Sequence, residues 1–452
     1  MKRYEAYKNC NIPWIKQIPS HWMTKRAKFL YKKEQRPVRE EDSVVTCFRD
    51  GVVTLRKNRR TTGFTEAISE FGYQGIRKGD LVIHVMDAFA GAIGVSDSDG
   101  KGTPVYNVCT AYGDSNNYYY AYALREMARA GFIQSLYHGI RERSSDFRFD
   151  VFERQYLPVP PREEQEQIVR YLDWQVSKIN RLIAAKREKI ALFEELKTHQ
   201  ITDAVLHGVK QYKKYIKTQE FGRIPAHWQI YQNKRLFRER VEHSKMGAET
   251  LLSVSKHYGV KPSADLTEDE QFATIKPALS LAGYKVVHKN DLVMNIMRAR
   301  NGSYGISAYN GIVSPAYCIY YVTKNCNVKY LHYFLRTPHV KSLFETYSSG
   351  IAEHRRRLYP EDFLRLASVL PPIEDQNEIV EYIEQSLVKY DEAIANLKRQ
   401  IACLQDMKTR LISDVVTGQV DVRGIKVPDN EYINNEITEE EFEEESENNE
   451  EE

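Results

Sequence analysis

The sequence predicts an α+β fold in which two mixed α/β domains are joined by two long antiparallel coiled-coil helices with pseudo-twofold symmetry. Three observations support this prediction. The chain repeats itself at a spacing of 211 residues, each copy opens with mixed helix and strand patterns, and each copy closes on a long heptad pattern. This period far exceeds the roughly 20 to 50 residues of solenoid repeats, so it indicates two copies of a whole module.

The repeat is defined by identical residues that keep one register over most of the module. Among them are the pairs Gly72/Gly283, Tyr73/Tyr284, Asp80/Asp291, Met86/Met297, Gly91/Gly302, Gly94/Gly305, Leu124/Leu335, Arg125/Arg336, Gln165/Gln376 and Asp203/Asp414. Each copy is preceded by a related lead-in, IPSHW at 18–22 and IPAHW at 224–228, and here the spacing is 206 residues. We interpret His21 and His227, each beside a tryptophan, as packed aromatic anchors rather than as metal ligands or bases.

The body of each copy has mixed helix and strand patterning. Short apolar runs such as GDLVIHVM at 79–86 and NDLVMNIM at 290–297 follow a turn, which is typical of strands. Residues 118–125 and 330–336 have the pattern of a helix start. Two mixed α/β bodies are therefore predicted.

A proline-rich string closes each body, LPVPPREEQEQIV at 157–169 and VLPPIEDQNEIV at 369–380. Proline fits the first turn of a helix, and the acidic residues that follow suit the positive end of the helix dipole. We expect each helix to run to a glycine cap, so that the first ends at about His207 and the second at about Thr417.

The two helices carry equivalent apolar seams, which are interrupted only by Lys186 and Lys408. The seam residues are Leu172, Val176, Ile179, Ile183, Ile190 and Phe193 in the first helix, and Ile383, Leu387, Tyr390, Ile394, Leu397, Ile401, Leu404 and Leu411 in the second. One seam cannot be buried alone, so we expect the two to pair as an antiparallel rod of roughly 65 Å. The alternative is that each helix packs on its own domain.

These patterns divide the chain into five segments. The predicted segments are a first domain at 1–156, a first spacer helix at 157–208, a second domain at 209–368, a second spacer helix at 369–424 and a disordered acidic tail at 425–452.

The charge is unevenly distributed along the chain. Residues 431–452 contain twelve glutamates and no lysine or arginine, and the remaining residues hold 65 basic and 50 acidic side chains, a net charge of +15. Such an excess favours a polyanionic partner, because each neutralised phosphate releases bound counterions. The tail is expected either to act as a solubilising end or to compete with DNA for the basic surface.

Other features of the composition exclude several classes of protein. No stretch approaches the roughly 18 apolar residues of a membrane helix, and the N-terminus has no apolar signal segment, so a cytoplasmic protein without membrane contact is expected. The six cysteines form no CxxC pair, so neither a zinc site nor a disulfide framework is expected.

Motifs for catalysis are absent from the sequence. The string at 94–101 is one residue too long for a Walker loop, and the proline pairs at 160–161 and 371–372 lack the polar residue of an amino-methyltransferase signature. The charged strings at 195–197 and 406–408 fall in the heptad helices, where adjacent side chains diverge, so a nuclease metal site is not predicted. We therefore expect no catalytic centre, cofactor site or metal site.

Taken together, these strings resemble the specificity subunit of type I restriction-modification enzymes. The resemblance rests on the two IPxHW lead-ins, the GDLV and NDLV runs, SSGIAEH at 348–354 and the proline-rich strings before the long helices. It extends from residue 12 to residue 424. The order of these strings, repeated twice, is far more specific than any one of them.

The resemblance implies a non-catalytic DNA-binding subunit of a larger complex. Each domain would be a target-recognition domain for one half of a bipartite, asymmetric DNA site, and the helices would set the spacing and dock the partner subunits. The implied partners are double-stranded DNA, two methyltransferase subunits and restriction/translocase subunits. S-adenosylmethionine, ATP and magnesium would be bound by those partners rather than by this chain. Alternatives are a self-sufficient enzyme and a two-headed protein adaptor that does not recognise DNA.

Candidate DNA contacts are expected where the two copies keep their frame but change their side chains. Residues 87–90 correspond to 298–301, residues 141–146 correspond to 352–357, and residues 56–60 lie in a variable stretch of the first copy. Arginine can donate two hydrogen bonds to guanine and asparagine can pair with adenine, while other basic residues contact phosphates. The predicted DNA-binding residues are Arg56, Lys57, Arg59, Arg60, Asp87, Arg141, Arg143, Arg148, Arg298, Arg300, Asn301, His354, Arg355, Arg356 and Arg357.

Overall fold

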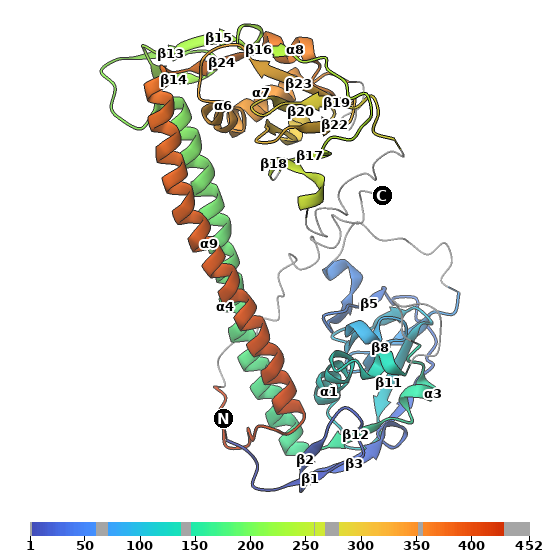
Figure 1. Cartoon of the computed structure of the whole chain (residues 1–452). Coiled ribbons are helices and arrows are strands. Elements are labelled where there is room, and N and C mark those ends of the chain that lie inside the picture. Colours follow the sequence, from blue (N-terminus) through green and yellow to red (C-terminus); the bar gives the residue numbers. More distant parts are fainter. Residues whose placement is uncertain are drawn as a thin grey trace. The chain divides into compact units, whose positions relative to one another are not determined.

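The computed structural model describes residues 2–59, 71–136, 146–256, 258–266, 280–350 and 356–428. The chain divides into two compact units (Figure 1). The first consists of Met1–Lys186 and Arg399–Glu439, and the second contains Arg187–Lys398. Each unit therefore combines one α/β body with parts of both long helices.

The body of the first unit is built around a four-stranded antiparallel sheet of order β4-β11-β8-β9. Its strands are β1 Tyr7–Asn9, β2 Gln17–Pro19, β3 Met23–Arg26, β4 Tyr31–Lys33, β5 Val45–Cys47, β6 Val53–Leu55, β7 Gln74–Ile76, β8 Leu81–His84, β9 Ile93–Val95, β10 Gly100–Gly102, β11 Tyr106–Ala111 and β12 Tyr156–Val159. Its helices are η1 Ala27–Phe29, η2 Arg56–Asn58, η3 Ala88–Ala90, α1 Asn117–Arg129, α2 Phe132–Ser135 and α3 Phe149–Phe152. The remaining strands pair as β1-β2, β3-β12, β5-β6 and β7-β10.

The body of the second unit repeats this plan, with a central sheet of order β16-β23-β20-β21. Its strands are β13 Tyr215–Thr218, β14 Gly222–Pro225, β15 Gln229–Gln232, β16 Phe237–Glu239, β17 Leu252–Ser255, β18 Gly259–Pro262, β19 Lys285–Val287, β20 Leu292–Asn295, β21 Tyr304–Ile306, β22 Gly311–Val313, β23 Tyr317–Val322 and β24 Ala367–Leu370. Its helices are η4 Asn233–Arg235, η5 Ser263–Asp265, η6 Ala299–Asn301, α6 Val328–Leu335, α7 Pro338–Tyr347 and α8 Pro360–Arg365. The other pairs, β13-β14, β15-β24, β17-β18 and β19-β22, match those of the first body one for one.

The two long helices are α4 Arg162–His207 and α9 Ile373–Val416, and they pair antiparallel within each unit. In the first unit, Asn180 of α4 accepts a hydrogen bond from Lys408 of α9 at 3.2 Å. In the second unit, Phe193 of α4 packs edge-on against Tyr390 of α9, with ring centroids 6.1 Å apart. The predicted fold class, two mixed α/β bodies joined by two paired helices, is confirmed.

Each body packs on the start of the helix that follows it and on the end of the other long helix. Tyr119 of α1 donates a hydrogen bond to the carbonyl of Val416, at the end of α9, at 3.2 Å. Tyr330 of α6 donates in the same way to the carbonyl of Val205, at the end of α4, at 3.1 Å. All four residues are buried, so the C-terminal turn of each helix completes the hydrophobic core of the other repeat's body.

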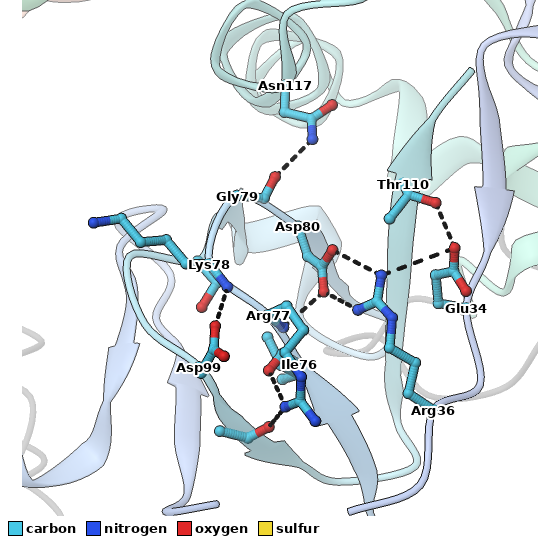
Figure 2. Close-up of polar contacts among 12 residues, drawn as sticks. Glu34, Arg36, Ile76, Arg77, Lys78, Gly79, Asp80, Asp99, Thr110 and Asn117 are labelled. Atoms are coloured by element: carbon cyan, nitrogen blue, oxygen red, sulfur yellow. Dashed lines mark hydrogen bonds and ion pairs between the residues drawn. The ribbon is translucent and has the colours of Figure 1, made fainter. Parts of the chain in front are cut away.

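The second residue of the GDLV run is a buried aspartate that holds the turn before β8 (Figure 2). Both carboxylate oxygens of Asp80 accept hydrogen bonds from Arg36, and one also accepts from the backbone N–H of Arg77 at 2.7 Å. Asp291 repeats the arrangement with Arg240, whose Nε donates at 2.7 Å. The repeated aspartate therefore has a structural role in starting the central strand.

The two lead-ins are anchored to the first turn of a long helix. Glu164 of α4 accepts a hydrogen bond from Trp22 Nε1 at 2.9 Å and lies 2.8 Å from His21 Nε2. Asp375 of α9 accepts from Trp228 Nε1 at 3.0 Å and lies 2.9 Å from His227 Nε2. Each histidine also packs against a tyrosine ring, His21 against Tyr4 at 5.6 Å and His227 against Tyr212 at 5.1 Å between centroids, as expected of aromatic anchors.

Candidate nucleic-acid interface

Three segments of the first body meet at the end of β8. The backbone N–H of Phe147 donates to the carbonyl of Val85 at 3.1 Å, and Asn107 donates to the carbonyl of Phe147 at 3.0 Å. These bonds fix residues 146–148 beside the turn that carries Asp87. The loop between β5 and β6 is the third segment. We call residues 48–59, 85–90 and 146–148 the first edge.

Asp87 is the centre of a polar cluster in the first edge. Its Oδ1 accepts a hydrogen bond from Arg49 at 3.1 Å, and its Oδ2 lies 3.5 Å from His84 Nε2. Its backbone N–H donates to His84 Nδ1 at 3.1 Å. Burial lowers the pKa of His84, and the nearby carboxylate of Asp87 partly opposes this effect. The cluster thus connects the η3 turn to the β5-β6 loop.

Two basic residues in or beside η2, which follows β6, are held in defined positions. Arg59 forms an ion pair with Asp50 at 2.7 Å, and its guanidinium carbon lies 4.6 Å from the centre of the Phe48 ring. Arg56 Nε donates to Thr46 Oγ1 at 3.3 Å. Arg59 is therefore held in the structure of the loop, while Arg56 contacts β5.

The second body brings the equivalent segments together. The backbone N–H of Leu358 donates to the carbonyl of Ile296 at 3.0 Å, which places residues 356–358 beside the η6 turn. Arg336 donates to the carbonyls of Lys256 and Tyr304, so it connects the β17-β18 loop to β21. Burial lowers the pKa of the Arg336 guanidinium. We call Lys256, residues 296–301 and residues 356–358 the second edge.

The described members of the predicted DNA-binding set fall on these two edges. In the first body they are Arg56, Lys57, Arg59, Asp87 and Arg148, and in the second body they are Arg298, Arg300, Asn301, Arg356 and Arg357. Arg60, Arg141, Arg143, His354 and Arg355 lie outside the described residues. Binding of DNA by any of these residues stays a prediction.

The sequence analysis missed two basic residues of the edges, Arg49 and Lys256. Both lie in hairpin loops, where the 211-residue register is lost because the copies differ in length. Each loop contains a left-handed glycine, Gly51 with φ +91° and Gly259 with φ +76°. The sequence signal for Arg49 and Lys256 is a basic residue shortly before a glycine, with a short apolar run on either side of the turn.

Within the described ranges, no group of histidine, cysteine, aspartate and glutamate side chains is arranged to hold a metal ion. Burial lowers the pKa of His332 to about 4, and Arg336 adds to this effect, so this imidazole is neutral at physiological pH.

Among the described residues, none of the helices has both the length and the apolar composition that a membrane span needs.

No family model matches the chain. A relative in Methanocaldococcus jannaschii, the MjaX specificity subunit assigned to a type I restriction enzyme, is 23% identical over 272 residues. The match covers 59% of this chain and 60% of the relative, so the chain spans less than two thirds of the length of the curated relative it matches.

A solved structure shares the fold over most of the chain. A chain from a structural study of the assembly and conformational transition of the type I R-M system aligns with a TM-score of 0.64, covering 89% of this chain and 99% of that one, at 15% identity. The chain therefore shares its fold with that solved chain. The HsdS subunit from Thermoanaerobacter tengcongensis also aligns over 89% of this chain and 98% of its own, with 16% identity and a TM-score of 0.45.

Some repeated polar residues lie away from the edges and hold the scaffold of each body together. Gln165 accepts a hydrogen bond from the backbone of Asn116, and Gln376 accepts one from the backbone of Asn327, at 2.9 and 2.8 Å. Both glutamines are buried. Each one joins the start of a long helix to the start of a helix in the body, so these identities between the copies belong to the scaffold.

Proposed function

We propose that this chain is a non-catalytic DNA-sequence specificity subunit of a type I restriction-modification complex. Each α/β body recognises one half of a bipartite, asymmetric DNA site. The long helices set the spacing between the halves and dock methyltransferase subunits. The observation that carries this proposal is the pair of equivalent edges, which share a backbone frame but differ in their side chains.

The chemistry of the edges supports recognition of DNA. Arg298, Arg300 and Asn301 lie in or beside a single 3-10 turn, where Asp87 and its neighbours lie in the first body. Arginine and asparagine are the side chains best suited to guanine and adenine, whereas aspartate can accept a hydrogen bond from cytosine. Different side chains on one frame would allow the two half-sites to differ.

The partners and cofactors belong to the same proposal. The complex would contain double-stranded DNA, two methyltransferase subunits and restriction/translocase subunits. S-adenosylmethionine for adenine methylation, and ATP and magnesium for the restriction activity, would be bound by those partners. The net charge of +15 outside the glutamate-rich tail favours the polyanion.

Co-expression with the neighbouring methyltransferase gene tests the proposal. Genomic DNA from cells with both genes, either gene or neither would be sequenced for methylated adenine. A split motif that is methylated only when both genes are present would support the proposal. Methylation by this chain alone would instead indicate a self-sufficient enzyme.

A two-headed protein adaptor is the second candidate, and the duplicated bodies alone would also suit it. It predicts that the chain neither binds duplex DNA nor changes the methylated motif when its edges are altered. Exchanging the η6 residues 298–301 for the η3 residues 87–90 would separate the two roles. An altered motif in one half would contradict the adaptor.

A further inference from the structure

The first edge compensates its own charges. Three of its arginines form ion pairs with three of its aspartates: Arg49 with Asp87 at 3.1 Å, Arg59 with Asp50 at 2.7 Å, and Arg148 with Asp146 at 2.7 Å. With Arg56 and Lys57, the edge holds five basic and three acidic residues, a net charge of +2. A phosphate that approaches it must therefore compete with carboxylates already in place.

The second edge lacks these acids at the equivalent positions. At the 211-residue spacing, Asp87 corresponds to Arg298 and Asp146 corresponds to Arg357. The registers of the β5-β6 and β17-β18 hairpins match Asp50 to position 257, a histidine that lies outside the described residues. The second edge thus contains five basic residues and no acidic residue; with β18 and η5, the counterparts of β6 and η2, it gains Lys261 and Asp265, so its net charge stays +5.

The correspondence of the two loops is structural as well as sequential. A Cβ on Gly94 would lie 1.9 Å from the carbonyl oxygen of Gly51, and a Cβ on Gly305 would lie 3.0 Å from the Cα of Gly259. Each hairpin loop therefore packs against the same glycine of the central sheet.

From this asymmetry we propose that the second edge provides most of the sequence-independent attraction for DNA phosphates, while the first edge, neutralised by Asp50, Asp87 and Asp146, contributes mainly to discrimination between bases. The proposal rests on the DNA-binding role proposed above. It also gives Asp87 a positioning role, because its carboxylate holds Arg49 beside the η3 turn.

The exposure of the pairs indicates how each behaves when DNA binds. The Arg59 and Asp50 side chains are 15% and 14% exposed, so this pair remains closed and serves the loop. Arg148 and Asp146 are 71% and 45% exposed, and Arg49 and Asp87 are 50% and 30% exposed. Exposed pairs contribute little to stability and open readily, but their acids still offset the charge that a phosphate encounters.

The salt dependence of DNA binding tests this proposal. On duplex DNA, the slope of the logarithm of the binding constant against the logarithm of the salt concentration changes by about 0.9 for each phosphate that the protein neutralises. Full-length protein would be titrated against a long mixed-sequence duplex over a range of KCl concentrations. The matched variants are Arg298→Ala with Arg357→Ala in the second edge, and Arg49→Ala with Arg148→Ala in the first.

We expect the second-edge double variant to lose about 1.8 units of slope, and the first-edge double variant to lose less than half as much. Asp87→Asn with Asp146→Asn should tighten binding and steepen the slope. Arg298→Lys with Arg357→Lys keeps the charge and should retain the slope, which separates a charge effect from misfolding. Thermal unfolding of every variant checks that the bodies remain folded.

Two results would overturn the inference in distinguishable ways. If the unaltered chain binds the duplex and both arginine pairs change the slope equally, the asymmetry is wrong while the DNA-binding role stands. If the unaltered chain shows no salt-dependent binding to the duplex, the DNA-binding role is contradicted and the asymmetry with it.

Discussion

At the scale of single residues, the acidic side chains of the helix starts connect the lead-in of each body to its long helix. Glu164 and Asp375 each accept from a tryptophan indole and contact a histidine. Asp375 also forms an ion pair with Lys210 at 3.1 Å. Burial by itself would raise the pKa of Asp375. The hydrogen bonds from its three partners lower it by more than burial raises it, so the pKa of Asp375 lies below its ordinary value.

Asp375→Asn should destabilise the second unit by about 2 kcal/mol, because a buried charged acceptor of several hydrogen bonds is lost. The pKa of Asp375 is lowered in the folded state, so its stabilisation is present above the ordinary aspartate pKa and is lost as pH falls through the lowered value. Thermal unfolding at several pH values should show the two proteins converging in acid. Asp391→Asn, which removes an exposed partner of Lys197, is the control and should have little effect. A gap that stayed constant into acid would contradict the assignment.

Gly94 provides a second test at this scale, since its missing Cβ makes room for the loop that carries Arg49. Gly94→Ala should cost about 1–3 kcal/mol, the usual range for overpacking a tight site. Gly305→Ala should cost less, because its Cβ would lie 3.0 Å from the nearest atom rather than 1.9 Å. Gly424→Ala is the control, with no atom within 4 Å of its Cβ. Equal stability of Gly94→Ala and Gly424→Ala in thermal unfolding would show that the loop does not pack this closely.

At the scale of elements, the paired helices explain the two lysines that interrupt the heptads. Lys186 of α4 donates to Gln400 of α9 at 2.6 Å, and Lys408 of α9 donates to Asn180 of α4 at 3.2 Å. Each lysine therefore uses its seam position for a polar contact across the pair. Polar residues at seam positions specify register at a cost in stability.

Lys186→Leu should raise the unfolding temperature, because it completes an apolar seam position, with a gain of about 1 kcal/mol. Glu188→Leu places the same side chain on an exposed position of α4 and should produce no such gain. Circular dichroism melts of both variants would measure the difference. If Lys186→Leu melted below the parent, the hydrogen bond to Gln400 would outweigh the apolar contact.

At the scale of the whole molecule, each body depends on both long helices. Leu411, Val415 and Val416 of α9 are part of the first core, and Ala204 and Val205 of α4 are part of the second. Neither body is thus completed by one continuous stretch of chain. The predicted division into domains at 1–156 and 209–368 stays a prediction, and it omits these helix ends.

Replacing residues 1–156 by the corresponding body of another such subunit should change one half of the methylated motif and leave the other half unchanged. The reason is that each edge is assembled within one body. The exchanged body must keep a tyrosine at position 119, because this side chain bonds the end of α9. Methylome sequencing of cells with the hybrid and its methyltransferase measures the outcome. A change in both halves, or in neither, would contradict the assignment of one body to one half.

The sequence by itself determined the features that are local or periodic. Proline and acidic residues predicted the starts of α4 and α9, the heptads predicted their seams, and the 211-residue repeat predicted two bodies of one fold. The mismatched positions 87–90 and 298–301 were also found in this way, because a constant register makes side chains directly comparable. These signals survive without tertiary information, since they arise from chain geometry and hydrophobic spacing.

Only the tertiary structure decided which distant segments meet. The contact of Arg49 with Asp87, the loop bonds of Arg336 and the packing of Val416 under the first body join residues that share no period or motif. Such contacts are decided by how sheets and helices bury their apolar faces together, a property of the whole fold rather than of any local pattern. For the same reason, the pairing of Asp50, Asp87 and Asp146 with arginines, and with it the difference in charge between the two edges, emerged only when the loops were brought together.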